Sequence, residues 1–438
     1  MAHKKCLDVL VIGAGLAGLA AAISCANSGH HVIVVESARE LAEVGAGLQL
    51  TPNGTRILAD WGIGTSELRA ARPTRLSVFR YNGVKLATEE DFDKNIIKKY
   101  GAPFLDAHRV DLQKAMVRKA RELGVTICTG HEMTSIEQLP MSRVCVTTKQ
   151  PAVDQQKTFE ADLVVGADGL WSRAREHLIA DRGMDEKNTP KPLPTGDLAY
   201  RIVLQADTIK DEKLRQLVTK PECNFWIGPG AHAVAYSLRD GTEMNIVLLV
   251  PDRMEAGVRR EAGNVEEMRK LFDGWDPILT RFLDCVTKVD KWKLMHLSPL
   301  DNWTNKDKNV ILIGDSCHPM LPYLAQGANS SIEDGCVLGS LLANVNENFP
   351  VSHALDKFVE LRKSRGEAIA RETFHQRQAF HMPDGPDQEA RDRLFAKCLE
   401  DGVTGKFPSR WTCPEVQPWI YGYNATKTVA EALTSQSC

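Results

Sequence analysis

The sequence predicts an α/β fold in which a parallel-sheet domain holds an inserted antiparallel β-sheet and is followed by a helical C-terminal segment. Three observations carry this prediction. Residues 9–36 read as a strand, a glycine turn that opens a helix, and a second strand. Short runs with alternating apolar and polar residues occur between 198 and 250, as is typical of antiparallel strands. A further buried strand at 310–313 precedes long helices.

The first glycine turn has the spacing of a dinucleotide-binding motif. The apolar run 9–12 ends in Gly13, and Gly15 and Gly18 complete the pattern GxGxxG. Gly13 allows the tight turn, Gly15 lets the backbone approach a pyrophosphate, and Gly18 lets helix and strand pack closely. The second strand ends in Glu36, where a carboxylate can bind a ribose and disfavours a 2′-phosphate. The motif therefore predicts a Rossmann-like domain for FAD or NAD(P), with FAD or NAD favoured over NADP.

Composition excludes several classes of protein. The 438 residues suffice for two or three domains, or for one large core with an inserted subdomain. The 54 Lys and Arg balance 57 Asp and Glu without a basic tract, so no nucleic-acid partner is expected. Eleven scattered cysteines without a CxxC spacing argue against a disulfide framework and a zinc site, and favour a reducing, cytoplasmic location. The apolar stretch 7–26 contains the motif glycines, so it belongs to the core, and stable membrane association is not expected.

Local patterns predict the next elements. A glycine-rich segment at 43–54 leads into a helix that ends near Trp61, and its small residues allow the backbone to lie close to a flat ligand. Residues 76–104 contain short strands, a hairpin turn at Asn82-Gly83 and a lysine-rich connection. An amphipathic helix then begins at His108-Arg109.

Two short strands are predicted at 125–128 and 163–166. The second strand is apolar throughout, as a strand buried on both faces would be. It ends in the turn Asp168-Gly169, and a helix follows at 172–175.

The pattern changes between 178 and 295. Strands at 198–204, 234–238 and 244–250 alternate apolar and polar residues, and the last two flank an Asp240-Gly241 turn. This predicts an antiparallel, substrate-binding sheet inserted into the first domain. We expect a discontinuous cofactor-binding domain of 1–75, 105–177 and 296–375, a substrate-binding domain of 76–104 and 178–295, and a covering segment of 376–438.

A second glycine-rich block follows the strand at 310–313. Asp315 comes at the end of this strand, where it could accept a hydrogen bond from a ribitol hydroxyl. Gly327, Ala328 and Asn329 begin a helix, whose free N–H groups could face an electron-rich ring edge. Such a helix start stabilises negative charge on a reduced flavin.

Taken together, these motifs resemble the flavin-dependent single-component aromatic hydroxylases. The salicylate hydroxylase-like branch fits best, and some of its members act on phenolic polyketides. The resemblance rests on GxGxxG with Glu36, on Asp168-Gly169, and on the block from Gly314 through Asn329 to Asp334. It covers nearly the whole chain, including 381–388, and departs from the family only modestly, at Cys317 and Ser331, where alanine is common.

The resemblance implies FAD as cofactor and NAD(P)H as co-substrate, without a separate nicotinamide domain. It also implies positions around the cofactor: Glu36 at the adenosine ribose, Arg109 at the FAD phosphates, Asp315 at the ribitol or pyrophosphate, Ala328 and Asn329 at the isoalloxazine edge, Gly47 and Gln49 beside the flavin, and Asp168 near both FAD and NAD(P)H.

In such enzymes NAD(P)H reduces FAD, O₂ adds at flavin C4a, and an electron-rich carbon of a small phenolic aromatic attacks the hydroperoxide. Arg201 is the main catalytic candidate, because a guanidinium can stabilise a phenolate or carboxylate. An arginine in a matching Tyr-Arg strand has that role in family members that act on phenolic polyketides. Tyr236 is a second donor and His232 a weaker one, whereas His318 and Pro322 are expected to shape the loop and the ring pocket.

Several alternatives stay open. The product could be a catechol, the result of decarboxylative hydroxylation, or a dearomatised quinol of secondary metabolism, and an indole substrate is also compatible. A flavin halogenase is disfavoured because its Trp-x-Trp-x-Ile-Pro signature is missing. A flavoprotein-fold binding module would show degraded cofactor motifs, and an NAD-only dehydrogenase would not explain the second block. The oligomeric state is not predicted.

Overall fold

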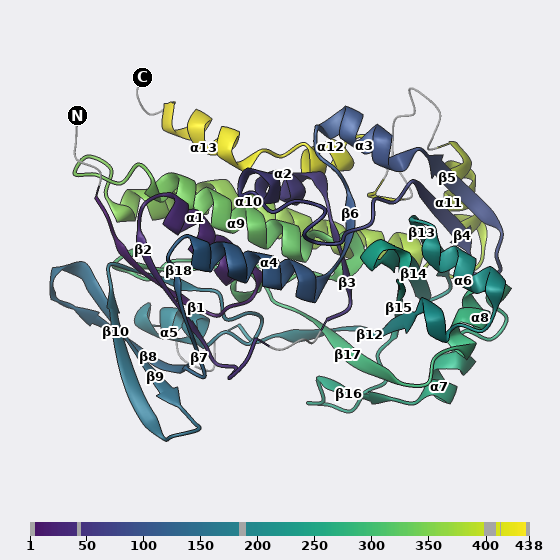
Figure 1. The fold of residues 1–438 in the computed structure, drawn as a ribbon, viewed down its shortest axis with the longest axis horizontal. Coiled ribbons are helices and arrows are strands. Elements are labelled where there is room, and N and C mark those ends of the chain that lie inside the picture. The colour runs from purple at the N-terminus through teal and green to yellow at the C-terminus, as the bar shows by residue number, and fades with distance from the viewer. Residues whose placement is uncertain (1–4, 42–44, 184–189, 398–408, 412, 435–438) are drawn as a thin grey trace.

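The computed structural model describes residues 5–41, 45–183, 190–397, 409–411 and 413–434. A parallel sheet lies at one end of the molecule and a larger sheet at the other, with α9 (Gln326–Leu342) and α10 (Val351–Phe380) running between them (Figure 1). Glu43 and Val44, at which the glycine-rich segment was expected to begin, lie outside the described residues. The same holds for Cys398 and Cys438.

The parallel sheet has five strands in the order β18-β11-β1-β2-β7. Their bounds are β1 Asp8–Ile12, β2 His31–Glu36, β7 Thr126–Thr129, β11 Leu163–Gly166 and β18 Val310–Leu312. The central strand is β1, which pairs in parallel with β2 on one side and β11 on the other. The glycine turn therefore leaves the sheet at its middle, where the carboxyl ends of parallel strands form ligand sites.

Helices cover one face of this sheet and a small antiparallel sheet covers the other (Figure 1). The helical side contains α1 (Leu16–Asn27), α4 (Arg109–Glu122) and α9, and α5 (Arg173–Asp181) packs beside β18. The opposite face holds β8 (Glu132–Leu139), β9 (Arg143–Gln150) and β10 (Gln155–Ala161). The sequence analysis did not foresee these three strands, which bury only alternate side chains such as Val144 and Val146.

The second sheet has eight strands in the order β16-β17-β12-β15-β14-β13-β4-β5. Their bounds are β4 Arg75–Arg80, β5 Lys85–Glu90, β12 Leu193–Gln205, β13 Glu222–Gly228, β14 Ala231–Leu238, β15 Glu243–Pro251, β16 Arg260–Gly263 and β17 Val289–His296. The predicted turns are present: Asn82-Gly83 joins β4 to β5, and Asp240-Gly241 lies between β14 and β15. The pairing is antiparallel except between β13 and β4.

The lysine-rich connection expected within 76–104 is wrong for 92–100, which forms helix α3 (Phe92–Tyr100). Its apolar signal is short, because only Phe92 and Ile96 are buried. A two-stranded sheet of β3 (Gly47–Leu50) and β6 (Leu105–His108) then links the two large sheets, and α2 (Pro52–Asp60) follows β3.

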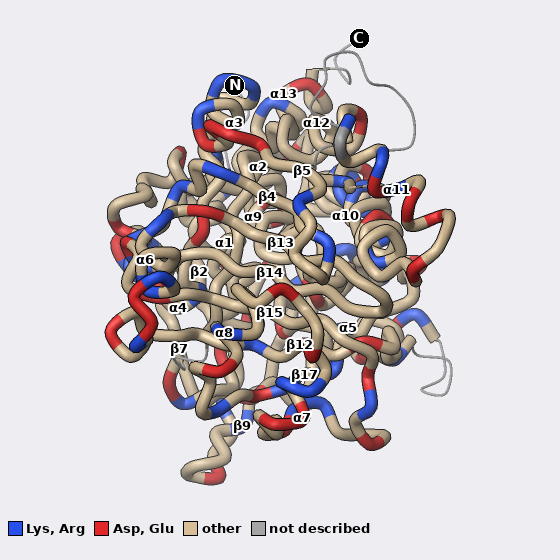
Figure 2. The backbone as a smooth tube through the Cα atoms, turned by 90° about the vertical axis from the view of Figure 1, so that its right-hand side faces the viewer, with Lys and Arg blue, Asp and Glu red and all other residues tan. Residues whose placement is uncertain are grey.

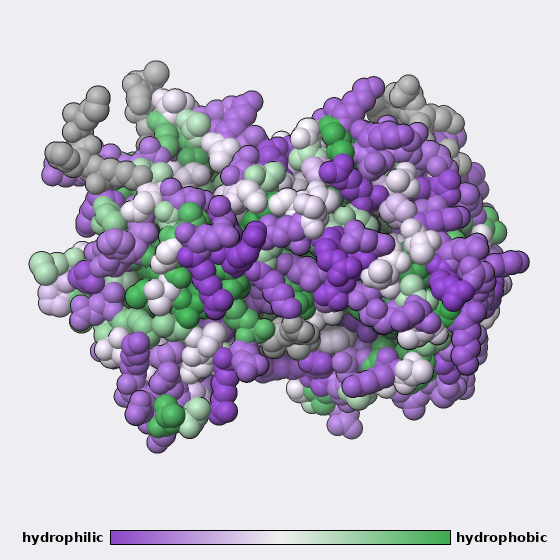
Figure 3. Space-filling model, in the orientation of Figure 1, coloured by the Kyte–Doolittle hydropathy of each residue, from purple (hydrophilic) through white to green (hydrophobic). Residues whose placement is uncertain are grey.

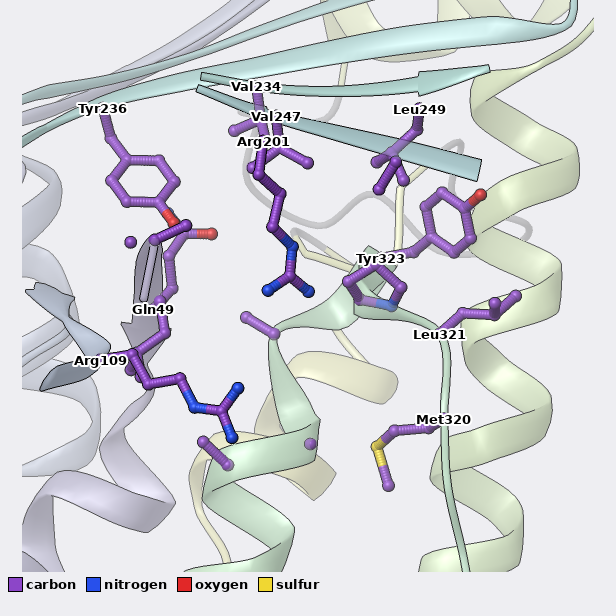
Figure 4. Close-up of a pocket in the computed structure, with 18 of the residues that line it drawn as sticks. Gln49, Arg109, Arg201, Val234, Tyr236, Val247, Leu249, Met320, Leu321 and Tyr323 are labelled. Carbon is purple, nitrogen blue, oxygen red and sulfur yellow. The ribbon is translucent and has the colours of Figure 1, made fainter. Parts of the chain in front are cut away.

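Helices α6 (Glu212–Thr219), α7 (Val265–Lys270) and α8 (Pro277–Asp284) enclose a core on one face of the eight-stranded sheet. The opposite face of this sheet points toward the start of α9 (Figure 4). The C-terminal segment contains α11 (Pro386–Lys397), α12 (Val416–Tyr421) and α13 (Ala425–Thr434). It contacts both halves of the molecule, since α11 lies against β5 and α13 packs on α9.

Basic and acidic residues alternate over the face that carries α6 and α8 (Figure 2). In the orientation of Figure 3, hydrophilic side chains dominate the surface and apolar ones form small scattered patches. Among the helices of the described residues, none combines the length and the apolar character needed to cross a bilayer.

Candidate active site

The glycine motif forms an open cradle at the start of α1. Gly13 has φ 104°, and a Cβ there would lie 2.5 Å from the carbonyl oxygen of Ala167. A Cβ on Gly18 would collide with the backbone of Gly13. At Gly15, by contrast, a Cβ would meet no heavy atom within 4 Å, so this side of the turn is free for a ligand. Each glycine therefore has the surroundings that its predicted role requires.

Glu36 lies across the same helix start. Its carboxylate accepts hydrogen bonds from the backbone N–H of Ala14 at 2.7 Å and of Ala38 at 2.8 Å. The cleft that it lines also contains Gly13, Gly15 and Asp168. A helix N-terminus with a fixed carboxylate beside it suits the pyrophosphate and ribose of a dinucleotide.

Asp168 lies in this cleft, but its carboxylate already has partners. It accepts hydrogen bonds from the Ser172 hydroxyl at 2.5 Å and from the backbone N–H groups of Arg173 and Ala174 at 2.8 and 3.0 Å. These bonds satisfy the first turn of α5. The structure thus gives Asp168 a capping role, and its contact with FAD or NAD(P)H stays a prediction.

A second cavity lies between the eight-stranded sheet and the start of α9 (Figure 4). Side chains on alternate positions of three neighbouring strands form its roof, as the two-residue period of a strand requires: Ala199 and Arg201 on β12, His232, Val234 and Tyr236 on β14, and Val247 and Leu249 on β15. The remaining wall comes from β3, from Arg109, from the segment 320–323 and from α9. This cavity joins seven of the predicted site residues: Gly47, Gln49, Arg109, Arg201, Tyr236, Asp315 and Ala328.

Two guanidinium groups point into this cavity without an ionic partner. Arg201 comes down from the sheet, and Arg109 extends toward the same space from the start of α4 (Figure 4). Neither side chain has an ion pair with any residue of the described ranges. The guanidinium of Arg201 lies 5.3 Å from the centroid of the Trp292 ring. Burial lowers the pKa of Arg201, and the charge of Arg109 lowers it further. Two guanidinium groups against the one carboxylate of Asp315 give the cavity lining an excess of positive charge, which favours an anion.

Tyr236 lies beside the roof arginine and above β3. A Cβ on Gly47 would come within 2.6 Å of the Tyr236 ring, so glycine is needed for this close approach. The Gly47 N–H donates to the Asn245 side chain at 2.8 Å, which fixes β3 against β15. Burial raises the pKa of Tyr236 well above its usual value, and the nearby Asp106 adds to this effect. Tyr236 thus remains a hydrogen-bond donor at neutral pH.

Gln49 is held by residues that the sequence analysis missed. Its side-chain nitrogen donates to Asp106 at 2.9 Å and to the sulfur of Cys223 at 3.3 Å. Burial raises the pKa of Asp106 to about 8, although the bond from Gln49 opposes this shift. One oxygen of Asp106 has no hydrogen-bond partner among the described residues. No local signal reveals such an acid, since Asp106 occurs in an otherwise ordinary buried strand.

The second motif block is divided between the cavity and the core. Asp315 is accessible from the cavity. The loss of solvation among the neighbouring protein atoms raises the pKa of its carboxyl group, and the charges of His318 and Arg109 oppose this shift. Ala328 lines the cavity in the first turn of α9. The Asn329 side chain does not reach the cavity: it accepts from the Thr51 N–H at 3.1 Å and donates to the carbonyl of Gln49 at 3.1 Å. The Asn329 side chain thus holds β3 against α9, and only the backbone of Asn329 remains available to the edge of a flavin ring.

His318 is buried outside the cavity lining, as its expected shaping role requires. Its Nε2 atom lies 2.6 Å from a carboxylate oxygen of Asp334, and its ring stacks on Trp303. Burial alone would lower the pKa of His318, but the Asp334 carboxylate outweighs it and the net shift is upward. Pro322 does line the cavity.

The geometry fits an FAD molecule. The open cradle at Gly15 suits its pyrophosphate, and the carboxylate of Glu36 suits its adenosine ribose. The first turn of α9 presents N–H groups to the cavity, as the electron-rich edge of a flavin ring requires. Both halves of such a cofactor find matching groups, which defines the chain as a flavoprotein.

Comparisons with known proteins agree with this geometry. A family model described as "FAD binding domain" matches residues 6–373. FAD-dependent monooxygenase OpS4 of Beauveria bassiana is 48% identical over 436 residues, which cover 99% of this chain and 98% of the relative. 3-Amino-4-hydroxybenzoate 2-monooxygenase PtmB3 of Streptomyces platensis is 31% identical over 95% of this chain and 96% of its own length.

A solved structure shares the whole fold. The substrate complex of a salicylate hydroxylase superposes with a TM-score of 0.74 at 19% identity, covering 98% of both chains. The chain belongs to the FAD binding domain family. The predicted fold and the resemblance to FAD-dependent aromatic hydroxylases are confirmed, and the enzyme is an FAD-dependent monooxygenase with NAD(P)H as co-substrate.

Proposed function

We propose that this monooxygenase hydroxylates a small phenolic aromatic that binds as its phenolate beneath Arg201. The observation that carries the proposal is the pair of guanidinium groups, Arg109 and Arg201, that line one cavity and form no ion pair among the described residues, against the single carboxylate of Asp315 in the same lining. Apolar side chains such as Val234 and Leu249 line the same space. A flat, apolar ring with one anionic oxygen would satisfy both features.

In this proposal Arg201 binds the phenolate oxygen and Tyr236 donates a second hydrogen bond to it. Charge on the ring oxygen raises the electron density at the ortho and para carbons, which prepares them for attack on an electrophilic oxygen. FAD supplies the redox chemistry when it is bound, taking a hydride from NAD(P)H and activating O₂. The cavity walls orient the ring and exclude water from this chemistry.

The proposal also assigns the cofactor contacts. Gly13, Gly15, Gly18 and Glu36 would hold the adenosine and pyrophosphate half of FAD, with Asp168 at the mouth of the cleft. Around the ring half, the assigned residues are Gly47, Gln49, Arg109, Asp315, Ala328 and the backbone of Asn329. Sheet membership supports the division of the chain into 1–75, 105–177 and 296–375 for the cofactor, 76–104 and 178–295 for the substrate, and 376–438 as cover.

The name of a relative narrows the class of substrate that we propose. The Streptomyces platensis relative is named for an aminohydroxybenzoate, an aromatic acid with a phenol group. A hydroxylated benzoate or a phenolic polyketide would suit the two guanidinium groups here. Simple hydroxylation, loss of a carboxylate and dearomatisation share the phenolate intermediate and differ only in the group on the attacked carbon. An indole has no acidic oxygen for Arg201 and fits this cavity less well.

The test is a visible absorption spectrum of the purified protein, followed by NADH and NADPH oxidation with a panel of phenols that includes salicylate and methylated dihydroxybenzaldehydes. We expect a flavin spectrum, substrate-stimulated oxidation and a product with one added oxygen atom, and CO₂ release would mark the decarboxylating route. A protein that cannot be reconstituted with FAD would contradict the proposal and favour a binding module. Stimulation by indoles alone would contradict the phenolate assignment.

A further inference from the structure

Two histidines form a direct contact between the substrate cavity and the protein surface. His232 lies on β14 and lines the cavity. Its Nδ1 atom is 2.7 Å from Nε2 of His381, which follows the last turn of α10 and is partly exposed. The Nε2 atom of His232 has no hydrogen-bond partner within the described residues. The pair thus offers one free nitrogen at each end.

The position of His381 is fixed by backbone and side-chain contacts. Its carbonyl oxygen accepts a hydrogen bond from the Gly230 N–H at 3.1 Å, just before β14. Three residues later, Asp384 accepts from Arg80 at 2.6 Å and from the Tyr81 hydroxyl at 3.2 Å. The segment after α10 is therefore attached to the sheet on both sides of the contact.

The groups around the pair keep both rings neutral. Burial lowers the pKa of His232 well below its usual value, and the neighbouring His381 adds to this shift. Burial also lowers the pKa of His381 to about 4, which Asp197 opposes and Arg377 reinforces. A neutral imidazole carries one N–H and one lone pair, so it can receive a proton at one nitrogen while it releases another.

We propose that His232 and His381 are the path by which the phenolic proton of the substrate leaves the cavity. This inference rests on the proposed function, because only a substrate that ionises in the cavity needs such a path. The structure explains the need: the roof guanidinium favours the phenolate, and beside the apolar side chains of Val234 and Leu249 the ring of His232 offers the released proton an acceptor.

The transfer balances with one proton in and one proton out. The substrate O–H bond breaks as an N–H bond forms at Nε2 of His232. The N–H bond at Nδ1 of His232 breaks as one forms at Nε2 of His381, and the proton on Nδ1 of His381 passes to solvent water. Both rings end as the other neutral tautomer, and the reverse transfer returns a proton to the product oxygen and resets the pair.

The neighbouring tyrosine is a poorer route. Tyr323 also lines the cavity, and its ring lies 5.1 Å from that of His232. Its hydroxyl donates to Asp197 at 2.5 Å, and this carboxylate is paired with Arg377. Burial raises the pKa of Tyr323, and Asp197 adds to the effect, so its proton stays on the hydroxyl. The Tyr323 side chain holds the wall beside the pair and does not carry the proton.

The experiment is a stopped-flow pH jump on the FAD-loaded enzyme with 4-hydroxy-3-nitrobenzoate as probe, because its phenolate is coloured. We expect His381→Gln, which keeps a polar group near Nδ1 of His232, to slow the appearance of bound phenolate more than tenfold. The final amount of phenolate and the FAD content should stay as in the wild type. In His381→Ala, imidazole added to the buffer should restore the rate. His375→Ala, an exposed histidine of the same helix, is the matched control.

Three results would overturn the relay. The first is an unchanged rate in His381→Gln, and the second is a slow rate in His381→Ala that imidazole does not restore, which would mean a structural role. The third is an equal loss of rate in His375→Ala. Failure of the proposed function looks different: the wild-type enzyme would then bind no probe, or would bind it without forming phenolate.

Discussion

Two groups of charged residues in this molecule each contain two arginines. Only one group is complete, in the sense that each of its arginines has a carboxylate as ion-pair partner. Between α9 and α10, Arg362 donates to Glu333 at 2.6 Å and to Asp334 at 2.7 Å, and Arg365 donates to Glu333 at 2.8 Å. All four side chains are buried. In the substrate cavity, Arg109 and Arg201 have no such partner among the described residues.

The presence or absence of ion-pair partners distinguishes arginines that stabilise the fold from arginines that are available to bind a ligand. A buried charge costs several kcal/mol unless a partner compensates it, so the complete group fastens α9 to α10 and to the C-terminal segment, where Arg365 also donates to the carbonyl of Trp419 at 2.9 Å. The guanidinium groups at the cavity are different, since Arg109 is exposed and Arg201 is partly exposed, so they stay available to a bound anion. Asp106 is an intermediate case: one oxygen of its carboxyl group accepts a hydrogen bond from Gln49, and the other has no partner among the described residues.

The largest effect is expected from breaking the complete group. Glu333→Gln removes the carboxylate that both arginines share, which leaves the buried Arg365 without a carboxylate partner and Arg362 with Asp334 alone. We expect a loss of about 3–5 kcal/mol in the free energy of unfolding, measured by denaturant titration of the FAD-loaded enzyme. Glu360→Gln on α10 removes an exposed carboxylate that pairs with Lys357, and it should cost less than about 1 kcal/mol. Equal losses of unfolding free energy in Glu333→Gln and Glu360→Gln would show that the complete group stabilises the fold no more than the pair of Glu360 and Lys357.

The buried carboxyl group of Asp106 should make the free energy of unfolding depend on pH. The folded pKa of Asp106 is about 8 against an unfolded value of 3.8. Its contribution to stability is complete below pH 4 and declines as the pH rises to 8, by about 2 kcal/mol between pH 6 and pH 8. Asp106→Asn should flatten this part of the profile, measured as the free energy of unfolding at each pH. The exposed variant Asp273→Asn should keep the wild-type slope, and a slope that persists in Asp106→Asn would contradict the shift.

Removing an unpaired charge should affect turnover and leave stability unchanged. We expect Arg201→Ala to keep its FAD and its melting temperature but to lower kcat/KM for the best phenol more than tenfold, or about 1.4 kcal/mol of transition-state stabilisation. Arg260→Ala is a close control, because Arg260 lies 4.9 Å from the same Trp292 ring but pairs with Asp290. Turnover that survives in Arg201→Ala would remove this residue from the site.

The smallest expected effect comes from crowding the cavity wall. Gly47→Ala places a methyl group against the ring of Tyr236. This contact should move the Tyr236 hydroxyl, which donates a hydrogen bond in the proposal, away from the substrate. We expect kcat of the FAD-loaded enzyme to fall about fivefold, or about 1 kcal/mol. Gly64→Ala, where a Cβ meets nothing within 4 Å, should behave as the wild type. A normal kcat in Gly47→Ala would show that the tyrosine is not held in place by this contact.

Local patterns were sufficient for much of this architecture. The glycines of the first turn, the strand that ends in Glu36 and the hairpin turns at 82–83 and 240–241 follow from steric rules that act over a few residues. These elements lie where the sequence predicts them. Arg201 on β12 and Tyr236 on β14 also reach one cavity, although β15 lies between their strands and the two were expected on neighbouring strands.

Features that depend on distant parts of the chain could not be read in this way. His232 and His381 are 149 residues apart, and Asn329 turns from the expected ring edge to a strand 280 residues earlier. No spacing rule joins such positions, because only the folded topology decides which side chains meet. Helix α3 and the sheet of β8, β9 and β10 bury too few apolar residues to give a strong periodic signal.

Binding of a phenolate by the guanidinium of Arg201 is tested by the pKa of a bound phenol. The measurement is a spectral titration of 4-hydroxy-3-nitrobenzoate bound to the FAD-loaded wild type and to Arg201→Ala. We expect a phenol pKa at least one unit lower on the wild type than in solution, and no such lowering in Arg201→Ala. The same pKa on both proteins, or a value on the wild type equal to that in solution, would contradict this binding.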